Sequence, residues 1–279
     1  MRISVNQIRE KKTKSEPLVM LTCYDYSTAR ILDDAGIELL LVGDSLGTVM
    51  LGYESTIPVT MDDIVHHTKA VVRGSKKAMV VADMPFLSYQ VNREEALYNA
   101  GRFIQEGGAG AVKMEGGENI ASIIKSITSA GIPVMAHLGL TPQYIHALGG
   151  YRIQGKSIDS AVRLYQDALA VEQAGAFALV LETVPTLVAA HISKVIKIPT
   201  IGIGAGAGCD GQVQVVHDIL GSFLDFKPKH ARRYANLAKT ITEAVTTYRD
   251  DVISHNFPGD EESFTIDSEV YEEFKRRIS

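Results

Sequence analysis

Short apolar runs recur along this chain, and several of them end directly in a charged or polar residue. A run of this length is typical of a buried strand, and a charge that follows at once lies at the carboxyl end of that strand. When the arrangement recurs strand after strand, the polar ends converge on one rim, which is where a parallel barrel has its active site. The runs are Leu39–Val42 before Asp44 and Ser45, Met79–Ala82 before Asp83, Ala111–Val112 before Lys113 and Glu115, Val134–Ala136 before His137, and Ala178–Leu181 before Glu182.

Strands and helices are expected to alternate through the whole chain. The expected strands are 18–23, 39–43, 78–83, 111–114, 133–137, 177–182, 200–203 and 213–217. The expected helices are 27–35, 60–72, 92–105, 118–130, 157–174, 185–194 and 229–251, with capping residues before and glycines after many of them. This alternation predicts an α/β fold, a TIM (β/α)8 barrel, whose usual length is about 250 residues.

An open doubly wound sheet is the alternative fold, and it needs a glycine-rich phosphate loop after the first strand. The first expected strand leads instead into Cys23–Tyr26, which contains no glycine. No linker rich in Pro or Ser divides the chain, so residues 1–279 are predicted to form one domain. Residues 1–16 are expected to form a cap with a short helix over the base of the barrel, and the acidic residues 259–279 a surface extension.

Composition and charge narrow the function classes. Of the 279 residues, 46% are hydrophobic and 22% charged, as in globular proteins, and the net charge is -5. This balance argues against nucleic acid and against an anionic membrane surface as partners. No segment resembles a signal peptide or a membrane span, so a cytoplasmic location is expected. Cys23 and Cys209 have neither CxxC nor zinc spacing and are expected to be buried, reduced thiols.

Two long loops follow strands that end in candidate site residues. They are Gly43–Val59, rich in Gly, Ser and Thr, and Gly139–Lys156, which carries three glycines between 149 and 155. Long loops in a compact domain are usually lids or binding loops, although ordinary surface irregularity is the alternative.

Asp44 and Asp83 follow neighbouring strands, so their carboxylates are expected to lie within reach of one cation. Oxygen ligands in a site with few protein donors suit Mg²⁺, which keeps waters and accepts oxygens from a substrate. A lone Asp more often caps a loop or helix, but two in register on adjacent strands favour the metal site.

Lys113 and Glu115 lie two residues apart, so on a strand their side chains point the same way. An inward ion pair at a barrel mouth is costly unless it binds something, so Lys113 is a candidate to hold a substrate carboxylate and Glu115 to reach the metal. A structural salt bridge is the alternative. His137 is a candidate hydrogen-bond donor or proton-transfer group, although a structural histidine fits the sequence nearly as well.

Glu182 is the candidate general base. It is expected across the rim from Asp44 and Asp83, in a mostly apolar setting that raises its pKa toward neutrality. Capping of the helix expected from 185 is the alternative. The run Gly202–Gly208 has glycine at every second position, which is not a nucleotide-binding spacing, and it indicates close approach of backbone or of a flat ligand.

Five segments carry a family resemblance, and they occur in the family's order. The sequence resembles the ketopantoate hydroxymethyltransferase family from about residue 3 to about residue 265, in the motifs LVGDSLG (41–47), VADMPF (81–86), VKMEGG (112–117), HLGLTPQ (137–143) and IPTIGIGAG (198–206). Such an ordered set is far more specific than any single motif.

That resemblance implies a TIM barrel of the phosphoenolpyruvate mutase and isocitrate lyase superfamily. It implies transfer of a one-carbon unit from the co-substrate 5,10-methylenetetrahydrofolate to 3-methyl-2-oxobutanoate, giving 2-dehydropantoate on the way to pantothenate and coenzyme A. It also implies Mg²⁺ and a homo-oligomer, usually a homodecamer. Carried onto this chain, it implies Asp44 and Asp83 as metal ligands with Glu115 in the metal's shell, Ser45 and Lys113 as substrate contacts together with both aspartates, and Glu182 as the base.

The chain departs from the family pattern at two positions. Ala136 stands where glycine is expected, and its methyl group is predicted to narrow the pocket slightly beside His137; Gln214 stands where leucine is expected. One rival reading is another Mg²⁺-dependent 2-oxo acid lyase or mutase of the superfamily, which the lack of a cysteine after strands four and five disfavours. The other is a non-enzymatic scaffold barrel, which has no use for so many charged strand ends.

Overall fold

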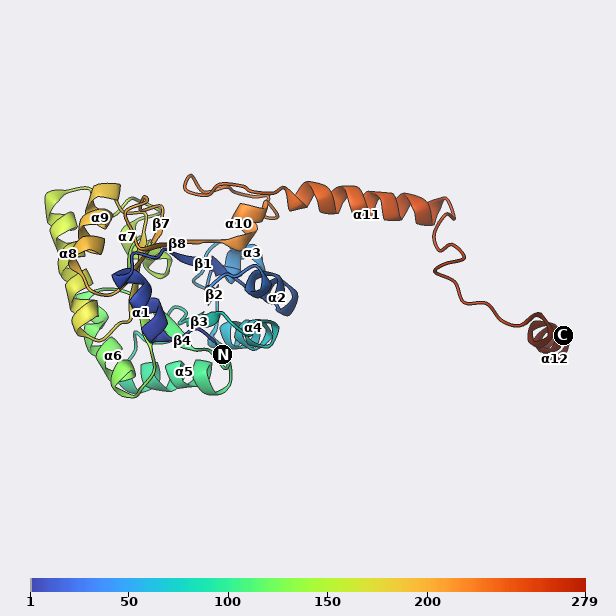
Figure 1. Cartoon of the computed structure of the whole chain (residues 1–279), viewed down its shortest axis with the longest axis horizontal. Helices are drawn as coiled ribbons and strands as arrows, with labels where there is room; N and C mark the ends of the chain where they lie inside the picture. The colour runs from blue at the N-terminus through green and yellow to red at the C-terminus, as the bar shows by residue number, and fades with distance from the viewer. Residues whose placement is uncertain (1) are drawn as a thin grey trace.

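The computed structural model describes residues 2–279 and contains a closed barrel of eight parallel strands in sequential order (Figure 1). The strands are β1 (Leu18–Thr22), β2 (Leu39–Val42), β3 (Met79–Asp83), β4 (Ala111–Glu115), β5 (Val134–Gly139), β6 (Ala178–Glu182), β7 (Thr200–Ile203) and β8 (Gly211–Gln214). The barrel closes where β8 pairs with β1. The predicted TIM barrel is therefore confirmed.

Helices surround the barrel as the alternation predicted. The longer ones are α2 (Tyr26–Asp34), α4 (Met61–Gly74), α5 (Arg93–Gln105), α6 (Glu118–Ser129), α8 (Ile158–Gln173) and α9 (Thr186–Val195). Thr60 and Ser157 begin α4 and α8 with capping boxes, in which the cap side chain and the third helical residue satisfy each other's backbone N–H groups. Short helical turns lie within or after the loops: α3 (Leu46–Val49), η1 (Pro142–Tyr144), α7 (Ile145–Leu148) and α10 (Val216–Leu220).

Alternate strand residues pack on opposite sides of the barrel wall. Leu39, Leu41 and Val81 belong to a buried cluster inside the barrel, whereas Leu40 and Val80 belong to a larger cluster beneath the helices. This follows from the two-residue side-chain period of a strand, and it fixes which polar residue at each strand end faces the barrel axis.

The short amino-terminal helix covers the base of the barrel, as expected. It is α1 (Val5–Thr13), and Ser4 begins it with a capping box to Gln7. Its fully buried Ile8 joins the cluster inside the barrel, so α1 closes the end opposite the polar rim.

The bounds predicted for the eighth strand were wrong. The strand expected at 213–217 lies at Gly211–Gln214 (β8), because Val216 N–H donates to Thr22 Oγ1 (3.0 Å) and the chain turns there into α10. Gly211 begins β8 where a Cβ atom would lie 2.5 Å from the Leu18 carbonyl oxygen. The predicted helix 229–251 is α11 (Leu237–Ile253), because residues 222–236 form a loop rather than a first helical turn.

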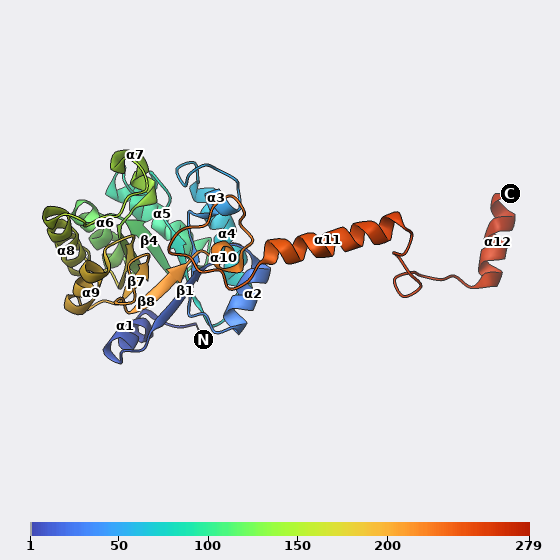
Figure 2. The same cartoon turned by 90° about the horizontal axis from the view of Figure 1, so that it is seen from above.

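The chain beyond the loop leaves the barrel. Figures 1 and 2 show α11 and α12 (Ser268–Ile278) extending away from it, so the acidic residues 259–279 lie far from the strands. The helix α12 was not foreseen. Both cysteines are free, and Cys23 is buried whereas Cys209 is half-buried. Among residues 2–279, none of the helices combines the length and the apolar character needed to cross a membrane.

Candidate active site

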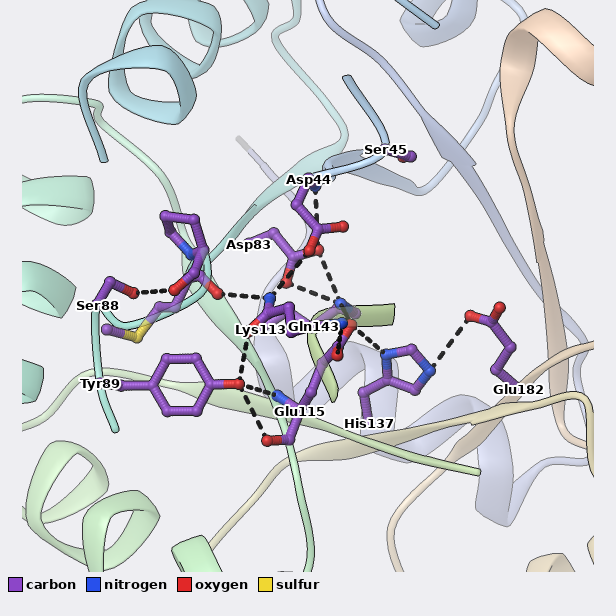
Figure 3. Close-up of polar contacts among 12 residues, drawn as sticks. Asp44, Ser45, Asp83, Ser88, Tyr89, Lys113, Glu115, His137, Gln143 and Glu182 are labelled. Carbon is purple, nitrogen blue, oxygen red and sulfur yellow. Dashed lines mark hydrogen bonds and ion pairs between the residues drawn. The ribbon is translucent and has the colours of Figure 1, made fainter. Parts of the chain in front are cut away.

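Strand register brings the predicted side chains to one rim. Asp83 on β3 lies opposite Lys113 on β4, and Glu115 lies opposite His137 on β5. Each occupies an inward position of its strand. Together with Asp44, Ser45 and Glu182 they line a cavity of about 670 Å³ at the carboxyl ends of the strands. All seven predicted site residues therefore meet in one place (Figure 3).

Lys113 forms the central ion pair of this cavity. Its Nζ donates to Asp83 Oδ1 (2.7 Å) and Oδ2 (2.8 Å), and it lies 3.6 Å from Glu115 Oε1. Burial opposes the charge of Lys113, but attraction to Asp83, Glu115 and Asp44 outweighs it and raises the pKa of the ammonium group. Lys113 is therefore a fixed cation among three carboxylates.

The three carboxylates together exceed the positive charge of Lys113. Burial, followed by repulsion from Asp83 and Glu115, raises the pKa of Asp44 well above its usual value. Burial also raises the pKa of Asp83, although Lys113 counteracts this. The Asp44 backbone N–H donates to Asp83 Oδ2 (3.2 Å), so the first two carboxylates are held next to each other. A further cation would relieve this excess of negative charge.

The donor set fits Mg²⁺ better than a metal held entirely by protein. Among residues 2–279, His, Cys, Asp and Glu side chains form no group of three or more arranged to hold a metal ion by themselves. Glu115 Oε1 is buried without a hydrogen-bond partner in that part of the chain. Since Mg²⁺ binds through one or two carboxylates and takes its other oxygens from water and substrate, Asp44 and Asp83 with Glu115 nearby suit it.

His137 links the carboxylate group to Glu182. Its Nδ1 lies 3.3 Å from Glu115 Oε1 and its Nε2 lies 3.3 Å from Glu182 Oε2. These are ion-pair contacts rather than aligned hydrogen bonds. Burial and Lys113 lower the pKa of His137, but the two glutamates outweigh them and raise it to about 9, so the imidazole is protonated at neutral pH.

The setting of Glu182 differs from the expected one. The sequence predicted a mostly apolar environment, but the Glu182 side chain is 17% exposed and paired with protonated His137. The sequence did not predict this partner, because His137 comes from a different strand. Glu182 is nevertheless positioned across the cavity from Asp44 and Asp83, with its carboxylate directed toward His137 (Figure 3).

Ser45 is held by a residue that the sequence did not single out. Its Oγ lies 2.8 Å from the hydroxyl oxygen of Tyr24, which is buried just after β1. Burial raises the pKa of Tyr24, so the phenol stays neutral and either hydroxyl group can donate. Tyr24 thereby fixes the Ser45 hydroxyl group at the cavity wall.

Gln143 and Tyr89 connect the carboxylates from behind, and the sequence reading missed both. Gln143 Nε2 donates to Asp44 Oδ2 (3.0 Å), and the Gln143 backbone N–H donates to Glu115 Oε2 (3.0 Å). The Tyr89 hydroxyl group donates to Gln143 Oε1 (2.8 Å) and accepts from the Glu115 backbone N–H (3.1 Å). The only signal for Gln143 was its place at the end of the HLGLTPQ motif.

The two long loops border the cavity, as predicted for binding loops. Thr48, Tyr53 and Glu54 line it from the first loop, and Leu140 and Tyr151 line it from the second.

Of the two departures from the family pattern, Gln214 lines the cavity and Ala136 does not. Ala136 belongs to the buried cluster beneath the helices, so its methyl group points away from the pocket, and the predicted narrowing was wrong. Gln214 pairs with Leu21, which is also in that outer cluster.

The glycine run after β7 serves helix packing. A Cβ atom at Gly206 would lie 2.4 Å from Thr186, and one at Gly208 would lie 2.5 Å from the Ala190 side chain. Both neighbours are on α9. Of the two readings of this run, close approach of backbone therefore applies at these positions.

Known proteins match the chain over its length. The profile of a family described as ketopantoate hydroxymethyltransferase matches residues 2–260. A 3-methyl-2-oxobutanoate hydroxymethyltransferase from Dehalococcoides mccartyi is 57% identical, with 100% of this chain and 99% of the relative aligned. A protein of the same name from Acetivibrio thermocellus is 56% identical over 96% of this chain and 94% of its own.

Solved structures show the same fold at low identity. A putative phosphonomutase from Burkholderia cenocepacia superposes with a TM-score of 0.65 at 15% identity, covering 88% of this chain and 100% of its own. A 2,3-dimethylmalate lyase of the PEP mutase/isocitrate lyase superfamily superposes with a TM-score of 0.61 at 14% identity, covering 95% and 90%.

Proposed function

Because this chain belongs to the ketopantoate hydroxymethyltransferase family, we propose that it transfers a hydroxymethyl group to 3-methyl-2-oxobutanoate and forms 2-dehydropantoate. The one-carbon donor is 5,10-methylenetetrahydrofolate, and the product leads to pantothenate and coenzyme A. The observation that supports this most directly is the single cavity in which Asp44, Asp83 and Lys113 lie opposite Glu182.

Substrate binding uses the buried ion-pair group. Lys113 offsets the negative charge of the 2-oxo acid, while Ser45, Asp44 and Asp83 contact its polar end. Asp44 and Asp83 would hold Mg²⁺, with Glu115 in its shell. When bound, Mg²⁺ supplies Lewis-acid stabilisation of the negative charge that develops on the keto oxygen.

Proton removal falls to Glu182. Its carboxylate takes the proton from the carbon next to the ketone, and the electron pair of that C–H bond forms the enolate. The enolate carbon then forms a bond to the one-carbon unit, both of whose bonds to folate nitrogens break. Water supplies the hydroxyl group, and the two nitrogens of the released tetrahydrofolate take up the second proton of that water and the proton held by Glu182. Protonated His137 orients Glu182 through the 3.3 Å contact, so the base is positioned before substrate arrives.

The decisive experiment is a product assay. The purified protein is incubated with 3-methyl-2-oxobutanoate, 5,10-methylenetetrahydrofolate and Mg²⁺, and 2-dehydropantoate is measured by mass spectrometry. Formation that depends on all three supports the proposal. Cleavage or rearrangement of another 2-oxo acid without folate would instead support a superfamily lyase or mutase.

Location and assembly follow from the same proposal. We propose a cytoplasmic enzyme that acts on small molecules, without nucleic acid or membrane as a partner, and that assembles as a homodecamer. Light scattering of the purified protein measures the assembly directly.

A further inference from the structure

Gln143 is a buried polar residue that contacts two of the site carboxylates and has no part in the reaction described above. It lies in η1, within the long loop that follows β5, and the residue is only 2% exposed. Its hydrogen bonds reach Asp44 after β2, Met84 after β3 and Glu115 on β4. Gln143 does not line the cavity and lies behind its wall, between Asp44 and Glu115 (Figure 3). It therefore joins the loop to three strand ends at the polar rim.

The Met84 carbonyl oxygen fixes which way the Gln143 amide points. The side-chain nitrogen Nε2 of Gln143 donates to this oxygen (2.9 Å), which can only accept a hydrogen bond. On the other side of the amide, Oε1 accepts from the Tyr89 hydroxyl group (2.8 Å) and from Gln90 Nε2 (3.4 Å). The reversed amide would set oxygen against oxygen at Met84 and nitrogen against nitrogen at Gln90. Gln143 must therefore present an N–H group to Asp44.

Asp44 and Glu115 each give one carboxylate oxygen to Gln143 and keep the other. Gln143 Nε2 donates to Asp44 Oδ2 (3.0 Å), and the Gln143 backbone N–H donates to Glu115 Oε2 (3.0 Å). Within residues 2–279, Asp44 Oδ1 and Glu115 Oε1 accept no hydrogen bond. Because a carboxylate held at one oxygen does not rotate freely, Gln143 decides which oxygen of each group is available to a cation.

No other side chain in that part of the chain takes over this role at Asp44. Lys113 Nζ is the nearest buried cation, but its hydrogen bonds go to the two oxygens of Asp83. Within residues 2–279, the Asp44 carboxylate accepts a hydrogen bond from Gln143 alone. Groups that hydrogen-bond to metal ligands orient them, and their loss typically weakens metal binding about 10- to 100-fold.

Tyr89 holds the amide in place from the far side. Its ring is fully buried, and its hydroxyl group donates to Gln143 Oε1 and accepts from the Glu115 backbone N–H (3.1 Å). One hydroxyl group thus fixes both the Gln143 amide and the strand residue that carries the second carboxylate.

We propose that Gln143 is a positioning residue for the metal ligands, which engages one oxygen of Asp44 and one of Glu115 and so leaves Asp44 Oδ1 and Glu115 Oε1 for Mg²⁺. The loop after β5 thereby completes a cation site whose ligands come from other strands. This inference rests on the proposed function, in which these carboxylates hold the metal.

The test is titration calorimetry of MgCl₂ into the purified protein without substrates. Gln143→Met keeps the side-chain length and the backbone N–H but removes the amide, and the Kd for Mg²⁺ is expected to rise about 10- to 100-fold. Partial misfolding would instead lower the fitted number of sites and leave the Kd of the folded fraction unchanged. An unchanged Kd, with or without a lower number of sites, would overturn the positioning role.

A second variant reaches the same amide through its support. Tyr89→Phe keeps the ring and removes the hydroxyl group, so the Kd is expected to rise about fivefold, the equivalent of one neutral hydrogen bond. If Gln143→Met does not fold, Tyr89→Phe with an unchanged Kd would overturn the proposal in its place.

The matched control makes the same chemical change elsewhere in the same loop. Gln154 is half-buried, and its Nε2 donates to the Arg152 carbonyl oxygen (3.0 Å) rather than to a site carboxylate. Gln154→Met is therefore expected to leave the Kd for Mg²⁺ unchanged. A rise equal to that of Gln143→Met would assign the effect to the loop as a whole and overturn the specific role of Gln143.

Steady-state kinetics give an independent readout. In Gln143→Met, the Mg²⁺ concentration that gives half the maximal rate is expected to rise by the same factor as the Kd, while the KM for the folate donor stays unchanged. A fall in kcat with an unchanged Mg²⁺ requirement would contradict positioning of the metal ligands.

The outcomes separate this inference from the proposed function. If the unaltered protein binds no Mg²⁺, the metal assignment fails and the positioning role fails with it. If Mg²⁺ binds and depends on Gln143 but no 2-dehydropantoate forms, the proposed function fails and the positioning role stands. If product forms and Gln143→Met binds Mg²⁺ as the unaltered protein does, only the positioning role is overturned.

Discussion

Replacing Lys113 with methionine tests whether the buried carboxylates depend on a cation. Lys113→Met keeps most of the side-chain volume but removes both hydrogen bonds to Asp83 and the attraction to Glu115. Removing one partner of a buried ion pair costs about 3–5 kcal/mol. Each kcal/mol lowers the Tm of a domain of this size by about 2–4 °C, so Tm is expected to fall by about 6–20 °C without metal.

The loss is expected to depend on pH. Asp44 and Asp83 already have raised pKa values, and loss of Lys113, which lowers both, raises them further. A carboxyl group whose folded-state pKa exceeds its unfolded value binds more protons when folded, so stability falls as pH rises through that range. The difference in Tm between Lys113→Met and the unaltered protein should therefore be larger near pH 8 than near pH 5.

Calorimetric unfolding in EDTA measures both effects. Lys125→Met is the control, because that exposed lysine forms no ion pair within residues 2–279, and its change is expected to stay within about 0.5 kcal/mol. The double variant with Asp83→Asn should recover part of the lost stability, since it removes the carboxylate left without its partner. A Tm unchanged by Lys113→Met, or a loss equal at both pH values, would refute the reasoning.

Three further predictions concern the proposed base Glu182, the proposed metal ligands Asp44 and Asp83, and Asp33. Glu182→Gln should abolish deuterium exchange at the substrate carbon next to the ketone, measured by NMR in D₂O; exchange at the unaltered rate would remove Glu182 from the role of base. Asp44→Ala and Asp83→Ala should each weaken Mg²⁺ binding in titration calorimetry by about tenfold or more, as expected when a carboxylate ligand is lost, and unchanged titrations in both would contradict the metal assignment. Asp33→Asn should lower stability by about 1–3 kcal/mol, because three backbone N–H groups (Ala78, Lys76 and Lys77) outweigh burial and lower the Asp33 pKa. In urea unfolding that deficit should be present near neutral pH and disappear as the pH falls through the lowered pKa, since the protonated carboxyl group loses the contribution that depends on its charge; a deficit that persists unchanged in acid would contradict it.

The strands and their inward residues were predictable because their signal is local. Lys113 and Glu115 face the barrel axis since they are two residues apart on β4, and the apolar run before them marks the strand. The same period explains why Ala136, which looks close to the site in sequence, points outward. The alternation that points His137 inward points the neighbouring Ala136 methyl group outward, so the predicted narrowing conflicts with the strand period itself.

Residues 222–236 were misread because local patterning does not decide their conformation. Lys229–Asp251 carries enough helix-forming residues to suggest one long helix, but Tyr234 N–H donates to the Ile219 carbonyl oxygen, and this contact holds the chain in a loop. Helix α11 begins only at Leu237, after Asn236 caps it. A contact between segments that lie on either side of a turn has no counterpart in the periodicity of either segment.

The pairing of His137 with Glu182 shows how tertiary structure changes a chemical inference. The sequence does not show which charged side chains lie beside Glu182, so burial is the only influence on this carboxylate that it predicts. In the barrel, β5 and β6 are neighbours. Gly139 on β5 pairs with Glu182 on β6, and His137 lies two residues before Gly139 on the same side of β5. This offset places His137 Nε2 3.3 Å from Glu182 Oε2 and His137 Nδ1 3.3 Å from Glu115 Oε1. Because two carboxylates raise the His137 pKa to about 9, the ion pair persists at neutral pH and is lost only as the pH rises through that value. The position of the proposed base thus depends, through His137, on Glu115, the same buried carboxylate that lies beside the proposed metal ligands Asp44 and Asp83.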